Sequence, residues 1–411
     1  MPGPGYAYFG AEERRNLLEV VDSWLATSDA HSRPPGVDAQ VRSLEEELSA
    51  RFASPHCLAV NSGTSALLAA LAALGIGPGD EVIVPGYLYT ASVSAVVFAG
   101  ATPVIAEVDE SLTLDPADVL ARITPRTKAV MPIHMLGAPC DLTALGQIAD
   151  DHGLYLLEDA AQACGATYRG RPVGTFGQSG AFSTNIFKVI TGGDGGFLLT
   201  PDERVFQRAY SFHHHGWFPY GQETGDGDQL FGLNLRMNAF TAAVARAQLG
   251  RLDAILDHNR ALARALSAAI PARDGLRPRP LHDADGDCAT LLVYLFDDAA
   301  SADAVAKELG TRTLLHSPKH HYGGLPEFAA LMAGDPRPSP FRRPPDKVRH
   351  DYRTGALPQT DAVLARSLAL TIGLTDTYLG ADFGLTTRST PADADAVAER
   401  FNAAVAGVLG P

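Results

Sequence analysis

The chain has 411 residues, enough for two or three domains of ordinary size. Its 46% hydrophobic and 19% charged residues are typical of a folded globular protein and exclude bulk disorder. A formal net charge of −14 argues against a nucleic-acid binder, which needs clustered Lys and Arg. The cysteines show neither a CxxC pair nor metal-ligand spacing, so we expect a reducing, cytoplasmic environment. We expect neither a signal peptide nor a membrane-spanning segment.

The first half of the chain alternates between short β-branched apolar runs and helical patterns. Two helices are expected first, at Glu12–Ala26 and Val37–Ala50, on either side of a Pro-rich break at His31–Gly36. Strands are then predicted at Glu81–Pro85, Thr102–Val108, Ala129–His134, Leu154–Glu158, Gly180–Thr184 and Gly196–Thr200. Helices between them are predicted at Ser65–Leu74, Thr90–Phe98, Asp115–Ile123 and Leu142–His152. This alternation predicts crossover units and a mostly parallel sheet, hence an α/β fold.

The second half is expected to carry a smaller α+β domain. A long Ala-rich helical region at Met237–Ile270 bridges to it. Beyond this region we expect a strand at Ala289–Leu295, helices at Ala302–Leu309 and Ala392–Val408, and a Pro- and Arg-rich loop at Ala333–Pro345. The predicted division is an N-terminal segment at 1–36, a large domain at 37–250 and a small C-terminal domain at 251–411.

A small polar turn opens directly into a helical pattern at residues 61–67, NSGTSAL. Free amides at a helix start, helped by hydroxyls, suit a bound phosphate. Ser and Thr are also common helix N-caps, and this turn alone does not separate the two roles. The turn matches neither the Walker pattern nor GxGxxG.

A carboxylate and a lysine follow two of the predicted strands. Asp159 stands at the end of an apolar run, where side chains point into the crevice of an α/β sheet, although such an acid also serves as a cap or ion pair. Lys188 is one of only five lysines, and its neighbours are apolar residues or glycine. Most lysines are solvated, but a lysine in apolar surroundings has a lowered pKa and reacts readily with carbonyls.

Together these three features fit one cofactor. Pyridoxal 5′-phosphate requires a phosphate cup, an acid beside its ring nitrogen and a lysine that condenses with its aldehyde. The chain presents them in the order cup, acid, lysine. The hypothesis is therefore a pyridoxal phosphate enzyme.

The motifs in this region resemble those of the DegT/DnrJ/StrS sugar aminotransferases. The resemblance runs from Leu44 to Asn259 and rests on NSGTSAL, VPGYLYTAS, ITPRTKAVMPIHMLGAPCDL, LEDAAQACGA, FSTNIFKVITGGDGG and GLNLRMNAFTAAVARAQLGRLD, in that order. It implies fold type I, with a mostly parallel seven-stranded sheet in the large domain. It also implies a homodimer whose active site is shared between subunits.

The resemblance assigns roles to individual residues. Lys188 and Asp159 match the catalytic lysine, which binds the cofactor and moves the proton, and the acid that pairs with the ring nitrogen. Further cofactor contacts are implied at Gly63, Thr64, Ser65, Tyr89, Gln162 and Ser183. Asn234 matches a phosphate ligand supplied by the other subunit, and Arg236 matches a position near the donor or substrate pocket. No metal is expected, because the histidines at 213–215 lack convergent spacing and matching ligands.

Two departures from the family pattern stand out, and the second bears on the substrate. Cys164 stands where the family usually has His, and the pair Lys188–Val189 is more similar to members that aminate cyclitol ketones such as scyllo-inosose. The resemblance implies transfer of an amino group from glutamate or glutamine to a keto-sugar, with or without a nucleotide attached, or to a keto-cyclitol. Such reactions belong to amino-sugar and antibiotic biosynthesis. The alternatives are another reaction on the same cofactor, such as dehydration, and a non-catalytic regulatory homologue.

Overall fold

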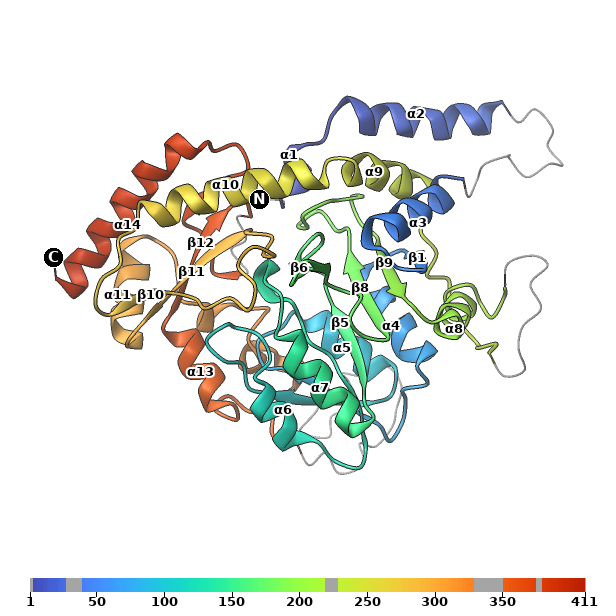
Figure 1. Cartoon of the computed structure of the whole chain (residues 1–411), viewed down its shortest axis with the longest axis horizontal. Helices are drawn as coiled ribbons and strands as arrows, with labels where there is room; N and C mark the ends of the chain where they lie inside the picture. The colour runs from blue at the N-terminus through green and yellow to red at the C-terminus, as the bar shows by residue number, and fades with distance from the viewer. Residues whose placement is uncertain (1–2, 27–38, 219–227, 329–349, 375–378, 411) are drawn as a thin grey trace.

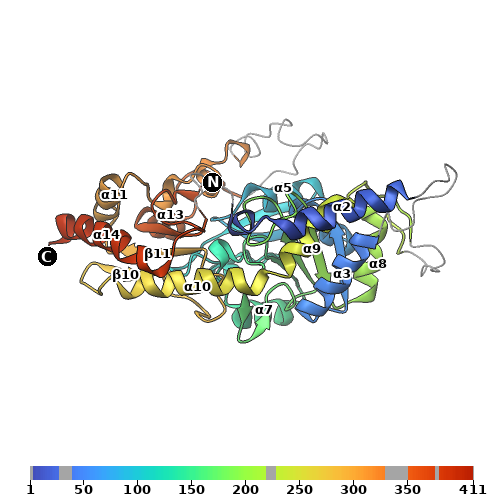
Figure 2. The same cartoon turned by 90° about the horizontal axis from the view of Figure 1, so that it is seen from above.

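The computed structural model describes residues 3–26, 39–218, 228–328, 350–374 and 379–410. Two sheets lie at opposite ends of the molecule, and the long helix α10 (Leu252–Ala268) runs between them (Figures 1 and 2). None of the helices in these ranges is both long and apolar enough to cross a membrane. The expected loop at Ala333–Pro345 and the break at His31–Gly36 lie outside the described residues.

The larger sheet has seven strands in the order β1-β9-β8-β5-β4-β2-β3. The strands are β1 (His56–Val60), β2 (Glu81–Pro85), β3 (Thr102–Ala106), β4 (Thr127–Val130), β5 (Tyr155–Asp159), β8 (Ser179–Ser183) and β9 (Gly196–Thr200). Neighbouring strands from β8 through β3 are parallel, and β9 pairs antiparallel with both β8 and β1. The predicted α/β class and mostly parallel seven-stranded sheet are confirmed.

Helices cover both faces of this sheet, because its strands are apolar on both sides. On β2, Val82 and Val84 pack into one hydrophobic cluster, and Ile83 packs into the other. Helices α4 (Gly63–Ala73), α5 (Thr90–Phe98) and α8 (Glu203–His213) contribute to the first cluster. Helices α3 (Ala39–Phe52), α6 (Pro116–Arg122) and α7 (Leu142–His152) contribute to the second. The N-terminal helices α1 (Pro4–Ala7) and α2 (Ala11–Leu25) precede this layer, and a small hairpin is formed by β6 (Thr167–Tyr168) and β7 (Arg171–Pro172).

The smaller sheet has four strands with helices packed on it. Its order is β10-β11-β12-β13, made of Leu276–Pro278, Leu291–Phe296, Ser367–Ile372 and Gly384–Leu385. Helices α10, α11 (Ala299–Glu308) and α14 (Ala394–Leu409) share one hydrophobic cluster with it. Short 3₁₀ turns occur at Met135–Gly137, Leu314–His316, Tyr322–Gly324 and Pro391–Asp393. The α+β character expected for the C-terminal part is therefore present.

Most predicted elements agree with the structure to within about two residues at each end, and two differ by more. The Ala-rich region at Met237–Ile270 is two helices, α9 (Ala239–Leu249) and α10, rather than one. The side chain of Asn238 caps the start of α9, and the two helices are separated by Gly250, which caps the end of α9, and Arg251, which precedes α10. The strand expected at Ala129–His134 ends at Val130, and Ile133 forms a single bridge to Asp159 instead.

Helix α10 belongs to two hydrophobic clusters. Leu252 and Leu256 pack with the large sheet, whereas Leu262 and Leu266 pack with the small one. Because α10 packs with both sheets, it does not by itself mark where one domain ends and the other begins. The predicted boundary between residues 250 and 251 stays a prediction.

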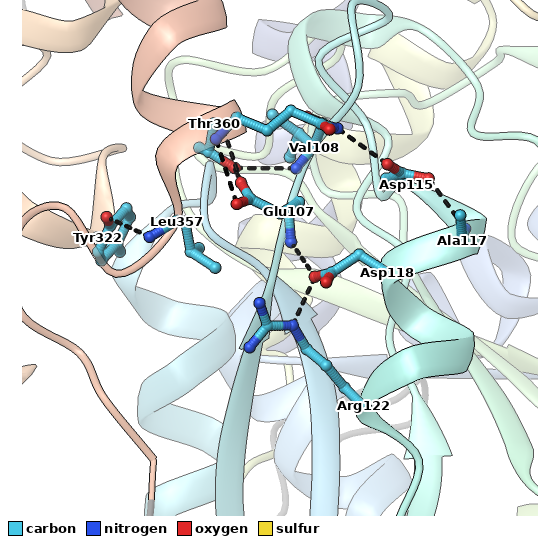
Figure 3. Close-up of polar contacts among 10 residues, drawn as sticks. Glu107, Val108, Asp115, Ala117, Asp118, Arg122, Tyr322, Leu357 and Thr360 are labelled. Carbon is cyan, nitrogen blue, oxygen red and sulfur yellow. Dashed lines mark hydrogen bonds and ion pairs between the residues drawn. The ribbon is translucent and has the colours of Figure 1, made fainter.

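A polar network ties helix α13 (Pro358–Ala365) of the C-terminal part to the large sheet (Figure 3). Glu107, just after β3, is buried, and its carboxylate accepts hydrogen bonds from the Thr360 backbone amide at 2.7 Å and the Thr360 hydroxyl at 2.6 Å. The amide of Gln359 adds a third bond at 3.2 Å. A carboxylate at a helix N-terminus is favourable, because the first amides of the helix lack intrahelical partners.

Candidate active site

A cavity of about 290 Å³ lies where the carboxyl ends of β1, β5 and β8 meet. Seven of the site residues expected from the sequence line it: Gly63, Thr64, Tyr89, Asp159, Gln162, Ser183 and Lys188. They come from five separate segments of the large domain. Parallel strands bring such segments to one edge of the sheet, which is where open α/β proteins bind ligands.

The turn before α4 (the cradle turn) forms one wall of the cavity, which Ser62, Gly63 and Thr64 line. Ser62 caps the helix, and its hydroxyl oxygen accepts a hydrogen bond from the Ser65 amide at 3.1 Å. A Cβ atom on Gly63 would lie 2.8 Å from the Cβ of Ser183, so only glycine lets the two strand ends approach this closely. The sequence left two roles open for this turn, a helix N-cap and a phosphate site. The turn can serve both, because Ser62 caps the helix while Gly63 and Thr64 line the cavity.

Ser65 differs from its predicted placement. Its hydroxyl donates a hydrogen bond to the side-chain oxygen of Asn61 at 2.6 Å and lies 2.9 Å from the Ser62 hydroxyl. It is buried behind the turn and is not among the residues that line the cavity. Its role as a direct phosphate ligand stays a prediction, and Ser62, which the sequence analysis did not select, lines the cavity in that region.

The carboxylate of Asp159 is buried and held in a fixed orientation. Its Oδ2 accepts a hydrogen bond from the Ser92 hydroxyl at 2.7 Å, and its Oδ1 accepts one from the Ala161 amide at 3.0 Å. Nearby, the side-chain oxygen of Gln162 accepts a hydrogen bond from the Leu136 amide at 2.8 Å. Both side chains are therefore oriented before any ligand binds.

Lys188 lies in the turn between β8 and β9. Its backbone amide donates to Asn185 O at 2.9 Å, and the next two residues, Val189 and Ile190, are buried beneath it. The N-terminal segment covers this turn, since the Gly3 amide donates to Ile186 O at 2.9 Å. A half-buried lysine, a buried acid and the first residues of a helix, all lining one cavity, are the set of groups that pyridoxal phosphate requires. The residues present fit the cofactor.

Asn234 and Arg236 lie outside the cavity. Both are exposed, and their segment runs beside β1, where the Asn61 amide donates to Leu235 O at 2.7 Å and Arg236 forms a bridge with Val60. The segment therefore lies beside the cradle turn, but neither residue is among those that line the cavity of its own chain. The role implied for Asn234 requires a second subunit, and the roles of both residues stay predictions.

The surroundings of the histidines at 213–215 and of Cys164 indicate neither a metal site nor a reactive thiol. The ring nitrogen Nδ1 of His213 is hydrogen-bonded to Tyr210 O, and burial lowers its pKa to about 4. In the described ranges no three His, Cys, Asp or Glu side chains gather as metal ligands would. Burial raises the pKa of the Cys164 thiol to about 12, so this thiol is neutral and unreactive at pH 7.

Residues from the C-terminal part complete the cavity, and none of them was predicted as a site residue from the sequence. Thr290, Lys319, His320, Leu374 and Leu379 line it. The imidazole ring of His320 lies 5.5 Å from the ring of Tyr89, centroid to centroid. One signal was available: Lys319 is among the five lysines of the chain, although nothing local distinguishes it from a solvated lysine.

Comparisons with known proteins agree with this geometry. The family model of the DegT/DnrJ/EryC1/StrS aminotransferase family matches residues 30–323, further than the motifs alone indicated. The L-glutamine:2-deoxy-scyllo-inosose aminotransferase of Streptomyces kanamyceticus is 42% identical over 58% of this chain and 58% of its own length. The 3-amino-5-hydroxybenzoate synthase of Amycolatopsis mediterranei is 36% identical over 80% of this chain and 81% of its own.

Solved structures share the fold over nearly the whole chain. A crystal structure of 3-amino-5-hydroxybenzoic acid synthase has a TM-score of 0.77 and 29% identity, covering 97% of both chains. The Streptomyces venezuelae DesV structure in complex with a ketimine intermediate has a TM-score of 0.72 and 30% identity, covering 96% of this chain and 95% of DesV. The protein is an aminotransferase that depends on pyridoxal phosphate. Its sequence, its fold and the residues gathered at the cavity place this chain in the DegT/DnrJ/EryC1/StrS aminotransferase family.

Proposed function

We propose that this enzyme transfers an amino group from glutamate or glutamine to the ketone of a sugar or a cyclitol. The observation that carries the proposal is the convergence of Lys188, Asp159 and the Gly63–Thr64 cradle on one cavity. The names of two relatives support this acceptor class. The Streptomyces kanamyceticus relative is named for 2-deoxy-scyllo-inosose, and a transaminase of Streptomyces venezuelae is named for a dTDP-linked amino sugar. The pair Lys188–Val189 favours a cyclitol ketone within this class.

The roles of the chain's own groups follow from their chemistry. When bound, pyridoxal phosphate supplies an aldehyde that condenses with amines and a ring that accepts electrons from the adjacent carbon. Asp159 keeps a proton on the ring nitrogen, because its buried carboxylate is already oriented toward the cavity. The amine of Lys188 holds the cofactor and then carries a proton to and from the substrate carbon. The amides of the cradle turn hold the phosphate.

We further propose a cytoplasmic homodimer in which Asn234 of each subunit completes the phosphate site of the other. Asn234 is exposed near the cradle turn and outside the cavity of its own chain, as such a role requires. A reducing compartment is supported by the four cysteines, all of which are free thiols and buried.

Trapping the lysine tests the assignment directly. Borohydride reduction followed by peptide mass mapping is expected to label Lys188 and no other lysine. Lys188→Ala is expected to lose both turnover and the visible absorbance of the lysine-bound cofactor, whereas Lys307→Ala on α11 is the matched control. Label on another lysine, or full turnover by Lys188→Ala, contradicts the proposal.

The acceptor is identified by a second measurement. The cofactor of the purified enzyme is first converted to its amine form with L-glutamine. Nucleotide keto-sugars and inososes are then screened for return of the aldehyde absorbance. A response to neither class contradicts the proposed acceptor.

A further inference from the structure

Two of the five lysines of the chain line the same cavity. Lys188 enters it from the large domain, and Lys319 enters it from the C-terminal part. Lys128 on β4 and Lys307 on α11 are exposed elsewhere. Within the described residues, no arginine lines the cavity, so these two amines are the cations that this part of the chain brings to it.

The segment that carries Lys319 is held against the large domain by its backbone. The amide of Leu88 donates to His320 O at 2.8 Å, and the amide of Tyr322 donates to Gly86 O at 3.0 Å. Tyr87 and His321 form an antiparallel bridge between these bonds. Lys319 therefore lies next to a short paired strand segment, opposite the residues that lead to Tyr89.

Side chains of this segment also hold it against the start of α13. The hydroxyl of Tyr322 accepts a hydrogen bond from the Leu357 amide at 2.9 Å and donates one to Asp361 Oδ2 at 3.1 Å. His321 pairs with Asp361 Oδ1 at 2.7 Å. Leu357 and Asp361 belong to the start of α13, which Glu107 ties to the large sheet through Thr360 (Figure 3). The Lys319 backbone is thus positioned by both parts of the molecule.

The charges at the cavity indicate what this amine binds. The phosphate cradle is built from amides and hydroxyls, and the carboxylate of Asp159 accepts hydrogen bonds from Ser92 and Ala161. Asp194, which also lines the cavity, accepts a hydrogen bond from the Gly195 amide at 3.0 Å. A keto-cyclitol, the acceptor favoured above, carries hydroxyls, whereas every amino-acid donor carries an α-carboxylate. A carboxylate that enters a half-enclosed cavity requires a cation or charged hydrogen-bond donor there.

We propose that Lys319 binds the α-carboxylate of the amino donor. The inference rests on the proposed function, because it assumes an amino-acid donor. It transfers to Lys319 the donor-binding role that the sequence analysis considered for Arg236, which is exposed outside this cavity. Lys319 is a binding residue for the first half-reaction and takes no part in moving the proton.

The experiment compares Lys319→Met with wild type, using the purified enzyme loaded with cofactor. L-glutamine is titrated in the absence of an acceptor, and conversion of the cofactor to its amine form is followed by absorbance. Binding of glutarate, which carries carboxylates but cannot react, is measured by calorimetry. Lys307→Met is the matched control. Lys319→Arg tests for rescue by another cation, and Lys319→Gln replaces Lys319→Met if that variant does not fold.

For Lys319→Met we expect the half-saturating L-glutamine concentration and the glutarate Kd to rise about tenfold to a hundredfold. The rate at saturation and the absorbance of the lysine-bound cofactor are expected to persist, because Lys188 and Asp159 are untouched. Lys319→Arg should recover most of the affinity, and Lys307→Met should match wild type.

Two outcomes overturn the inference. Unchanged donor and glutarate affinities in Lys319→Met show that another group binds the carboxylate. Loss of the lysine-bound cofactor absorbance in folded Lys319→Met shows that Lys319 serves the cofactor instead. A different result tests the proposed function itself: if wild type converts its cofactor with neither L-glutamine nor L-glutamate, the donor assignment fails before Lys319 is considered.

Discussion

The hydroxyl of Ser92 donates a hydrogen bond of 2.7 Å to Oδ2 of Asp159, and both side chains are buried. The bond joins the first turn of α5 to the last residue of β5, 67 positions along the chain. It fixes which way the acid faces before the cofactor arrives.

We expect Ser92→Ala to weaken cofactor binding about tenfold, because removing the hydroxyl leaves a buried carboxylate oxygen without its donor and frees the side chain to rotate. Equilibrium dialysis against pyridoxal phosphate measures the change. Ser94→Ala, on the same helix but outside the cavity, is the control. Equal affinities in both variants refute an orienting role for Ser92.

The cradle turn depends on the absence of a side chain at Gly63. A Cβ there would lie 2.8 Å from the Cβ of Ser183, so Gly63→Ala must push β8 and the turn apart. We expect cofactor affinity to fall about tenfold or more. Gly146→Ala on α7, where a Cβ meets nothing within 4 Å, should bind the cofactor as wild type does. Tight binding by Gly63→Ala would show that the cradle is not the phosphate site.

The contact between Glu107 and α13 is expected to stabilise the packing of the C-terminal part against the large sheet. Glu107→Gln weakens three hydrogen bonds to Gln359 and Thr360, so the free energy of unfolding should fall by about 1–3 kcal/mol. Urea denaturation followed by circular dichroism measures it, with exposed Glu308→Gln as control. A stability equal to that of the control argues that the packing of α13 alone joins the two parts.

Acid should destabilise the protein through His213. Burial lowers its pKa to about 4, below the ordinary value of 6.5, so the folded state holds this ring neutral. Stability from this group is complete above pH 6.5 and is lost as the pH falls from there toward 4, because the unfolded chain takes up the proton first. The loss amounts to about 3 kcal/mol.

The measurement is urea denaturation of wild type and His213→Gln between pH 7.5 and pH 4.5, ranges chosen around the two pKa values. The variant should be less stable at pH 7.5 but show a weaker dependence on pH in this interval. Parallel curves for the two proteins would assign the acid sensitivity to other groups.

Local patterns predicted the large domain well, and the reason is visible in its elements. Helices α5 and α7 and strands β2 and β9 have the predicted bounds, since each has a clear period and a terminating Gly, Pro or polar cap. Strand β1 was missed because His56–Val60 contains a single β-branched residue, Val60, whereas β2 contains three. In the C-terminal part, β12 and α13 were missed for want of an equally clear boundary.

The candidate site divides in the same way. Asp159, Lys188 and the cradle turn were recognisable because each follows a strand in a local motif, and parallel strands carry such motifs to one edge. The positions of Ser65, Asn234 and Arg236 relative to the cavity were not recognisable, because a side chain's direction depends on its neighbours in space. Ser92 was hidden in an apolar helix pattern until the structure placed it against Asp159.

By itself, the sequence determined the fold class, the family and the cofactor chemistry, because periodicity and short motifs are local properties of a chain. Only the tertiary structure decided which residues share the cavity, above all that Lys319 and His320 of the C-terminal part line it together with Lys188 and Tyr89, with the His320 ring against that of Tyr89. Those contacts join segments more than a hundred residues apart, and they exist because the packing of two sheets around α10 and α13 brings them together.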